Sequence, residues 1–411
     1  QMFKEHPLLG WGGGGWREAY QAYQSFFYVT NQTHGYYTQV AVETGVLGLA
    51  ALAGIWLSFL ALARRLYCGS KTSASRLLTA TLTVSALCIG LHAAIDFDLS
   101  LGAIALTLWT IFGLLRFLAV SGGERENDEI ALRKNCLSVN LLYAGIITVS
   151  IAVIFITGSF WLANYNLRKA DRYMHANEAG RVVESLFRAT SYNPLDPTPH
   201  MLLATYYLNG GEAEKAIAEG EKINKLSKYD ARNYVTLSKA YFITQDYSKA
   251  VSSAEKAMTL APFRALLYEN LSDIYLGVGC VELTGGNKAD AEDYFRKTVN
   301  VPDLLKAKMA GLSERGKKQW SLGPMMDDTL AIKQKTGAAQ YFLGNWEAAD
   351  KNLRAAMSDK AVMSDAALFL ALLRDKQGRS GESQDLLRQV QAVAPEMAGK
   401  FAMLKELSCL S

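Results

Sequence analysis

Three polar stretches in the first hundred residues carry side chains that could do chemistry. The first has four consecutive glycines, Gly12, Gly13, Gly14 and Gly15, followed closely by Arg17. Glycine adopts positive φ readily and can turn backbone N–H groups toward an anion, and an arginine can add a bidentate phosphate contact. Two interpretations follow: the stretch binds a phosphate group of a substrate, or it is a flexible loop beside a membrane helix.

The second stretch surrounds His34. Thr33 is a suitable helix N-cap, which would place His34 at the head of a helix that enters the membrane. A neutral histidine can accept a proton near neutral pH. Gln39 and Glu43 lie four residues apart and share a helix face, and an unpaired carboxylate at the bilayer edge would be costly. His34 is either a proton acceptor or a solvated loop histidine.

The third stretch contains His92 and Asp96, four residues apart at the end of an apolar segment. An aspartate can hold a histidine in one tautomer and orientation, as in hydrolase triads. Two ligands are too few for a metal site, so we predict no bound metal. The alternative is a structural polar pair that caps a tight transmembrane hairpin.

Four long apolar segments position these residues. They cover residues 45–63, 77–95, 99–120 and 139–163, and only short polar connections separate them. A bilayer core of about 30 Å requires about 20 apolar residues in a helix, so each segment is predicted to cross a membrane. We predict an all-α protein, with a four-helix transmembrane domain over residues 45–163 followed by a helical solenoid.

Basic residues predict which side each loop faces. The loop after the first apolar segment carries Arg64, Arg65, Lys71 and Arg76. The loop after the third carries Arg125, Arg133 and Lys134, and Arg116 lies just before it, near the end of that segment. Short cytoplasmic loops collect lysine and arginine, so both loops are predicted to be cytoplasmic. The loop 1–44, the turn 96–98 and the domain 164–411 are then outside.

The second half of the chain resembles a tetratricopeptide array. Its clearest unit, residues 231–262, has large side chains in a first helix, alanines in a second helix and a closing Pro262. Such solenoids present a concave surface, so we predict binding of protein partners there. Its histidines, His175 and His200, have no obvious partner, and residues 303–331 fit no clean unit.

Composition narrows the choice of function. The 411 residues include 43 Lys+Arg and 39 Asp+Glu, a balance that argues against nucleic-acid binding. The five cysteines are scattered without a CxxC pair, so neither a disulfide framework nor a zinc site is predicted. The chain begins at Gln1 within what looks like a loop, and we expect it to be a fragment that lacks further transmembrane helices upstream.

The motifs "HPLLGWGGGGW", "THGYYTQVAVETGVLGL" and "HAAIDFDLSLGAIALTLWTIFGLL" occur in this order. Over residues 5–118 the sequence resembles the C-terminal signature of the O-antigen ligase / O-antigen polymerase family. Many members of that family end in tetratricopeptide repeats. The resemblance implies a bacterial multi-pass membrane glycosyltransferase that acts on the outer side of the membrane. Its substrates would be an isoprenoid-diphosphate-linked glycan and a glycan or lipid acceptor, with no metal or other cofactor.

The resemblance also assigns residues. His34 occupies the family's histidine position, Arg17 is a loose match for a diphosphate-binding arginine, and Gly35 stands where the family usually has asparagine. A second arginine is expected upstream of this sequence. Our hypothesis makes His34 the base, supported by Glu43, and assigns diphosphate binding to Arg17 and the glycine run. His92 and Asp96 would have a structural or supporting role, and the fragment alone is expected to be inactive.

Two other classes of function are alternatives. A non-catalytic, membrane-anchored repeat protein that scaffolds an envelope or polysaccharide-export complex explains residues 140–411 equally well, but not the polar motifs in residues 5–44. A transporter would need ionisable groups deep in the helices, and none of the four segments has one near its middle.

Overall fold

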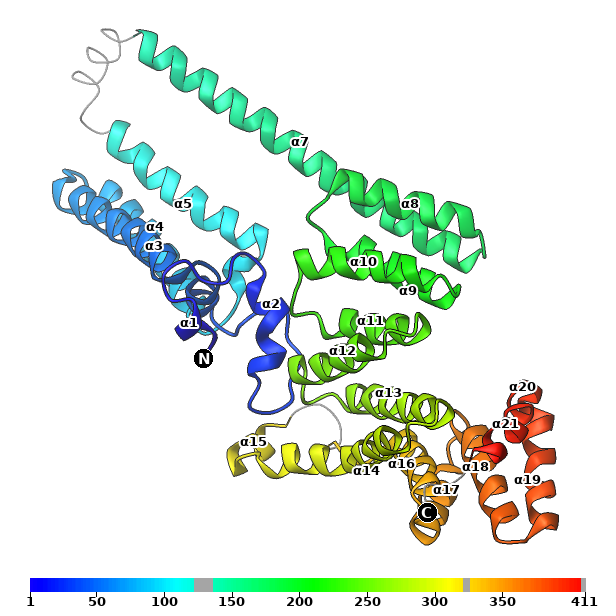
Figure 1. The fold of residues 1–411 in the computed structure, drawn as a ribbon. Coiled ribbons are helices and arrows are strands. Elements are labelled where there is room, and N and C mark those ends of the chain that lie inside the picture. The colour runs from blue at the N-terminus through cyan, green and yellow to red at the C-terminus, as the bar shows by residue number, and fades with distance from the viewer. Residues whose placement is uncertain (122–135, 321–325, 408–411) are drawn as a thin grey trace. The chain divides into compact units, whose positions relative to one another are not determined.

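The structure, a computed structural model, describes residues 1–121, 136–320 and 326–407 (Figure 1). Within these ranges the regular structure is entirely helical, which confirms the all-α prediction. The chain forms two compact units. The first comprises residues 1–23 and 29–165, and the second comprises residues 24–28 and the chain from Asn166 onward.

Among the described residues, four helices are long and apolar enough to cross a membrane, and each overlaps one predicted segment. The bounds in the first part of the chain are α1 (Met2–Glu5), α2 (Gly15–Ala19), η1 (Tyr20–Tyr23), α3 (Tyr36–Gly69), α4 (Ser73–His92), η2 (Asp98–Ser100), α5 (Gly102–Ser121) and α7 (Cys136–His175). Helix α3 begins nine residues before the predicted position 45, and α7 continues twelve residues past the predicted end at position 163.

Helices α3, α4 and α5 pack together through aromatic side chains. The rings of Phe59 and Phe112 stack with centroids 4.3 Å apart, and Trp56 meets Phe112 edge-on at 5.3 Å. Gly90 of α4 allows this packing, because a Cβ there would lie 2.5 Å from the Trp56 ring. The Tyr37 hydroxyl donates to the Gly90 carbonyl oxygen at 2.9 Å and ties the start of α3 to α4.

The second unit is a solenoid of antiparallel helix pairs (Figure 1). Its helices are α8 (Ala179–Tyr192), α9 (Pro197–Asn209), α10 (Ala213–Leu226), α11 (Ala231–Ile243), α12 (Tyr247–Leu260), α13 (Ala265–Thr284), α14 (Lys288–Ala310), α15 (Glu314–Gln319), α16 (Leu330–Phe342), α17 (Trp346–Ala356), α18 (Met363–Lys376), α19 (Ser380–Val393), α20 (Pro395–Ala398) and α21 (Lys400–Glu406). The predicted unit 231–262 is the pair α11 and α12. Ala250, Ala254 and Ala257 are fully buried there, as the close crossing of two helix backbones requires.

The irregular parts of the array also contain helices. Helices α13 and α14 are longer than the other repeat helices, with 20 and 23 residues. The stretch 303–331 contains the end of α14, the short helix α15 and the beginning of α16. The second basic loop of the topology prediction, with Arg125, Arg133 and Lys134, lies outside the described residues, and the sidedness stays a prediction.

Candidate functional site

The glycine stretch is held against a break in helix α3. Gly45 has φ +67° and ψ −163°, so the helix is interrupted there and its neighbouring backbone groups need other partners. The N–H groups of Trp11 and Gly12 donate to the carbonyls of Val42 and Glu43, each at 2.9 Å, and Val46 N–H donates to the Pro7 carbonyl at 2.8 Å. The break is therefore a binding site for the chain's own N-terminal loop.

Glycine is required on both sides of this contact. A Cβ at Gly45 would lie 2.3 Å from the Leu8 carbonyl oxygen, and a Cβ at Gly10 would lie 2.3 Å from the Glu43 carbonyl carbon. Both glycines also have positive φ, which is unfavourable for residues with side chains. The sequence analysis identified the glycine run but missed this break, because a lone glycine at the start of an apolar segment gives no such signal.

Glu43 binds the glycine run. Its Oε1 accepts from the Gly14 N–H at 3.1 Å and from the Gln39 side-chain amide at 3.3 Å. The Glu43 carboxylate therefore anchors the loop, and its support of His34 stays a prediction. An α-helix rises about 1.5 Å per residue, so Tyr36, at the start of α3, and Glu43 lie about 10 Å apart along the helix axis.

The glycine amides are mostly used inside the protein. Gly12 N–H donates to the Glu43 carbonyl, Gly14 N–H to the Glu43 carboxylate, and Gly15 N–H to the Gly12 carbonyl. This differs from the predicted open cradle made by the amides of Gly12 to Gly15: the anion that this loop holds is the protein's own carboxylate. Phosphate binding by the Gly14 amide would require the Glu43 carboxylate to move.

Arg17 lies on the short helix α2, which follows the glycine run. Its side chain is 64 % exposed, and its guanidinium is 3.9 Å from the Glu18 carboxylate. An exposed pair at this distance is weak and is screened by salt. The guanidinium is therefore accessible to an anionic group of a substrate, as the sequence-based hypothesis requires.

His34 is exposed and lies beside the turn that joins α4 to α5. Its ring centroid is 6.1 Å from that of Phe97. Gly35 has φ +127°, and a Cβ there would lie 3.0 Å from the Ala94 carbonyl oxygen, which accounts for glycine where the resembled family usually has asparagine. The Tyr36 N–H donates to the carbonyls of Ala93 and Asp96 at 2.8 and 3.1 Å.

Thr33 does not cap the helix as predicted. The residue at the N-cap position is Gly35, and no side chain caps α3. The buried Thr33 hydroxyl donates instead to the Gly35 carbonyl at 2.8 Å. The carbonyls of the α4–α5 turn take the place of the cap, so the start of α3 and this turn are fixed to each other.

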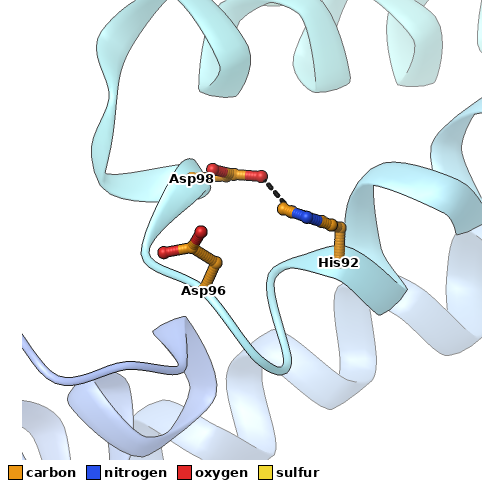
Figure 2. A group of neighbouring side chains, drawn as sticks. All are labelled: His92, Asp96 and Asp98. Atoms are coloured by element: carbon orange, nitrogen blue, oxygen red, sulfur yellow. Dashed lines mark hydrogen bonds and ion pairs between the residues drawn. The ribbon is translucent and has the colours of Figure 1, made fainter.

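His92 pairs with Asp98 rather than with the predicted Asp96. Figure 2 shows the His92 Nδ1 atom in contact with the Asp98 carboxylate, while Asp96 comes from the intervening turn. Helix α4 ends at His92, so the four-residue helical spacing does not continue to Asp96. The Asp96 carboxylate accepts from the Phe97 N–H at 2.7 Å. The sequence analysis missed Asp98, although it belongs to the same "DFD" motif.

These three residues are the candidate metal ligands among those the structure describes. One ligand atom from each of His92, Asp96 and Asp98 lies within 4.8 Å of the others. A hydrogen-bonded partner already occupies His92 Nδ1, and the Phe97 N–H contacts Asp96. These contacts give the cluster a structural role, and the prediction of no metal stays a prediction.

The histidines of the repeat unit have structural partners. The prediction that His200 has none is wrong: its Nδ1 is 2.6 Å from the buried Glu219 carboxylate, which also accepts from Lys222 Nζ at 2.7 Å. Burial alone would raise the pKa of Glu219, but the hydrogen bonds from His200 and Lys222 lower it below its usual value. His175 is exposed and lies near Asp171, its own neighbour on α7.

Comparison with known proteins supports the repeat architecture. Residues 231–264 match the tetratricopeptide repeat family, which confirms the predicted unit. Solved structures resemble the chain at low sequence identity. PilF of Pseudomonas aeruginosa is 15 % identical over 58 % of this chain and 94 % of its own, with a TM-score of 0.39.

Two further structures illustrate the same resemblance. A thermophilic TPR protein of Thermus thermophilus is 14 % identical over 51 % of this chain and 98 % of its own, with a TM-score of 0.40. The TPR2AB domain of yeast Sti1, solved as a complex with pHSP90, is 15 % identical over 60 % of this chain and 96 % of its own, with a TM-score of 0.28. No curated protein matches the chain.

Proposed function

We propose that the chain is part of a membrane glycosyltransferase that moves a glycan from an isoprenoid-diphosphate carrier to an acceptor hydroxyl in cell-surface polysaccharide biosynthesis. One observation carries the proposal. The first turns of α3, set apart by the break at Gly45, have the exposed His34 at one end and the glycine loop with the exposed Arg17 at the other. A broken membrane helix is tolerated where its backbone is buried in protein or lines a cavity.

This arrangement suits glycosyl transfer from a diphosphate. The bond between the anomeric carbon and the diphosphate oxygen breaks, and its electron pair leaves with the diphosphate. Arg17 stabilises that developing charge as a fixed cation. His34 takes the proton of the acceptor hydroxyl, whose oxygen forms the new glycosidic bond. His92, Asp96 and Asp98 hold the turn beside His34, and Glu43 holds the loop that carries Arg17.

The proposal includes sidedness and partners. The end of the helices that carries His34 faces outside a bacterial cell membrane, where the carrier-linked glycan and a glycan or lipid acceptor meet. The spans contact membrane lipids, the repeats bind a protein partner, and no nucleic acid is involved. Metal and cofactors are not required.

The test is a transfer assay with the full-length protein in proteoliposomes that contain an isoprenoid-diphosphate-linked glycan and its acceptor. His34→Ala should reduce transfer at least about a hundred-fold, because a positioned general base contributes about 10² to 10⁴ in rate. His175→Ala is the matched control, since that side chain is 81 % exposed on α7 and far along the chain from the site. Equal transfer by both variants and the unmodified protein would remove the proposed role of His34.

A second candidate function is a membrane-anchored scaffold. The match of residues 231–264 to the tetratricopeptide repeat family favours it, because stacked repeats form surfaces for protein partners. One experiment in cells distinguishes the two candidate functions. For a scaffold, loss of the repeats removes the surface polysaccharide while His34→Ala does not; for a transferase, His34→Ala removes it.

A further inference from the structure

The short segment 24–28, "QSFFY", belongs structurally to the repeat unit, although the chain on both sides of it belongs to the membrane unit. The chain thus leaves the membrane unit after Tyr23 and rejoins it at Val29. Arg17 lies seven residues before Gln24, and His34 lies six residues after Tyr28. Whatever fixes this segment therefore limits the positions open to both candidate site residues.

The segment packs on the stretch around α15, which in turn contacts Phe263. The ring of Phe27 lies 5.3 Å from the ring of Trp320, which meets Phe263 edge-on at 5.9 Å. Phe263 is buried and follows the unit 231–262, and the Lys308 ammonium lies over its ring, 4.7 Å from the ring centroid. We call Phe263, Gly316 and Trp320 the aromatic seat.

Gly316 on α15 lies beside the segment. A Cβ at Gly316 would lie 3.5 Å from the Ser25 carbonyl oxygen and 3.6 Å from the Cβ of Phe26, which are ordinary van der Waals distances for a side chain at this position. Gln24 is buried and its side-chain amide donates to the Tyr28 carbonyl, which closes the segment into a compact turn. The segment is therefore an ordered, packed element of the repeat unit.

The seat also accounts for the stretch 303–331, which fits no repeat. A regular repeat pair would continue directly from α14 to the next helix. Here the chain instead inserts α15 and Trp320 before α16, and it is this insertion that contacts residues 25–27.

We propose that the aromatic seat is a receptor for the segment 24–28 and that this docking constrains the chain on either side of the segment, which carries Arg17 and His34. The docking follows from the contacts themselves. Only its effect on glycan transfer rests on the proposed function.

The direct test is a disulfide. The Cβ of Phe26 and an ideal Cβ at Gly316 are 3.6 Å apart, within the range of about 3.5–4.5 Å that a disulfide spans. Phe26→Cys with Gly316→Cys, introduced together in the full chain with its native cysteines replaced, should cross-link on mild oxidation. Phe26→Cys with Gly381→Cys is the control, because Gly381 is exposed on α19. Equal cross-linking of both pairs would overturn the proposal.

A second measurement covers the case in which the Gly316 variant does not fold. Chymotrypsin cleaves after Phe26, Phe27 and Tyr28 once the segment is released. An aromatic pair contributes about 0.5–1.5 kcal/mol, so Trp320→Ala should raise the cleavage rate within 24–28 by about two- to ten-fold. Trp346→Ala, at an exposed tryptophan of α17, is the control and should leave it unchanged. Unchanged cleavage in Trp320→Ala, with the segment protected, would contradict docking on the seat.

The consequence for activity is tested separately. The oxidised Phe26→Cys/Gly316→Cys protein should retain glycan transfer, while Trp320→Ala should lower it by a similar two- to ten-fold factor. If the cysteine pair cross-links but Trp320→Ala leaves transfer unchanged, the docking is supported and its role in positioning is contradicted. If the pair does not cross-link and transfer is normal, the docking is contradicted and the proposed function is unaffected.

Discussion

The membrane helices and the repeat helices differ in how much of their apolar surface other helices of the chain bury. On α7, Ile154 and Phe155 are 70 % and 77 % exposed within the chain, and a helix of this length and composition is suited to contact with lipid. On α12, Ala250 and Ala254 are fully buried against neighbouring helices. Packing alone explains the repeat helices, whereas the break in α3 and its docked loop have no packing purpose in a simple membrane anchor. Irregularity in the membrane part therefore points to function.

The largest expected effect concerns that break. Gly45→Val places a branched side chain at positive φ and against the Leu8 carbonyl, which costs about 3 kcal/mol, or about a hundred-fold in local opening. Hydrogen–deuterium exchange at the amides of Trp11 and Gly12 should accelerate accordingly. Gly54→Val is the control, because nothing lies within 4 Å of a Cβ there. Equal exchange in the two variants would show that the loop does not depend on the break.

The next largest effect concerns a buried ion pair between two helices of the repeat part. Arg374 is 4 % exposed on α18 and pairs with Asp350 of α17, with Glu382 at 3.3 Å as a more exposed second partner. Asp350→Ala leaves the buried Arg374 guanidinium with only part of its charge paired. The substitution should destabilise this pair of helices by about 3 kcal/mol.

Exchange across α17 and α18 measures this loss. The control is Asp293→Ala, which removes only a surface pair with Lys297 whose side chains are 59 % and 44 % exposed, and should change stability by less than about 1 kcal/mol. Similar exchange in both variants would mean that the Arg374 pair is not a structural anchor.

A smaller effect depends on pH. The folded-state pKa of Glu219 is lowered relative to the unfolded chain, so its contribution to stability is present above the unfolded pKa and is lost as pH falls through the folded pKa. Glu219→Gln should therefore destabilise α9 and α10 by about 1–2 kcal/mol at pH 7, and the difference from the unmodified protein should shrink below about pH 4. Exchange measured at both pH values checks this. A difference that persists unchanged at low pH would contradict the assignment.

The smallest expected effect is that of metal removal. Because His92 and Asp96 already have protein partners, a chelator should leave glycan transfer within about two-fold of its untreated rate. A large loss that one divalent cation restores would instead make His92, Asp96 and Asp98 a metal site.

The sequence predicted the coarse architecture well for a physical reason. Long apolar segments and the large-and-alanine pattern of residues 231–262 are local signals, and both correspond to observed helices. The contacts of the site are not local. The partner of Glu43 is 29 residues away at Gly14, and the choice of Asp98 over Asp96 depends on where α4 ends. Likewise, nothing in "QSFFY" indicates that its partner is Trp320.

The account depends on the site facing away from the cytosol, and labelling tests this most directly. A membrane-impermeant maleimide is added to spheroplasts that carry His34→Cys or Ser70→Cys in a full chain without native cysteines. Ser70 lies at the end of α3, in the loop predicted to be cytoplasmic. We predict labelling of position 34 in sealed spheroplasts and of position 70 only after the membrane is opened. The reverse pattern would contradict both the topology and the transferase proposed from it.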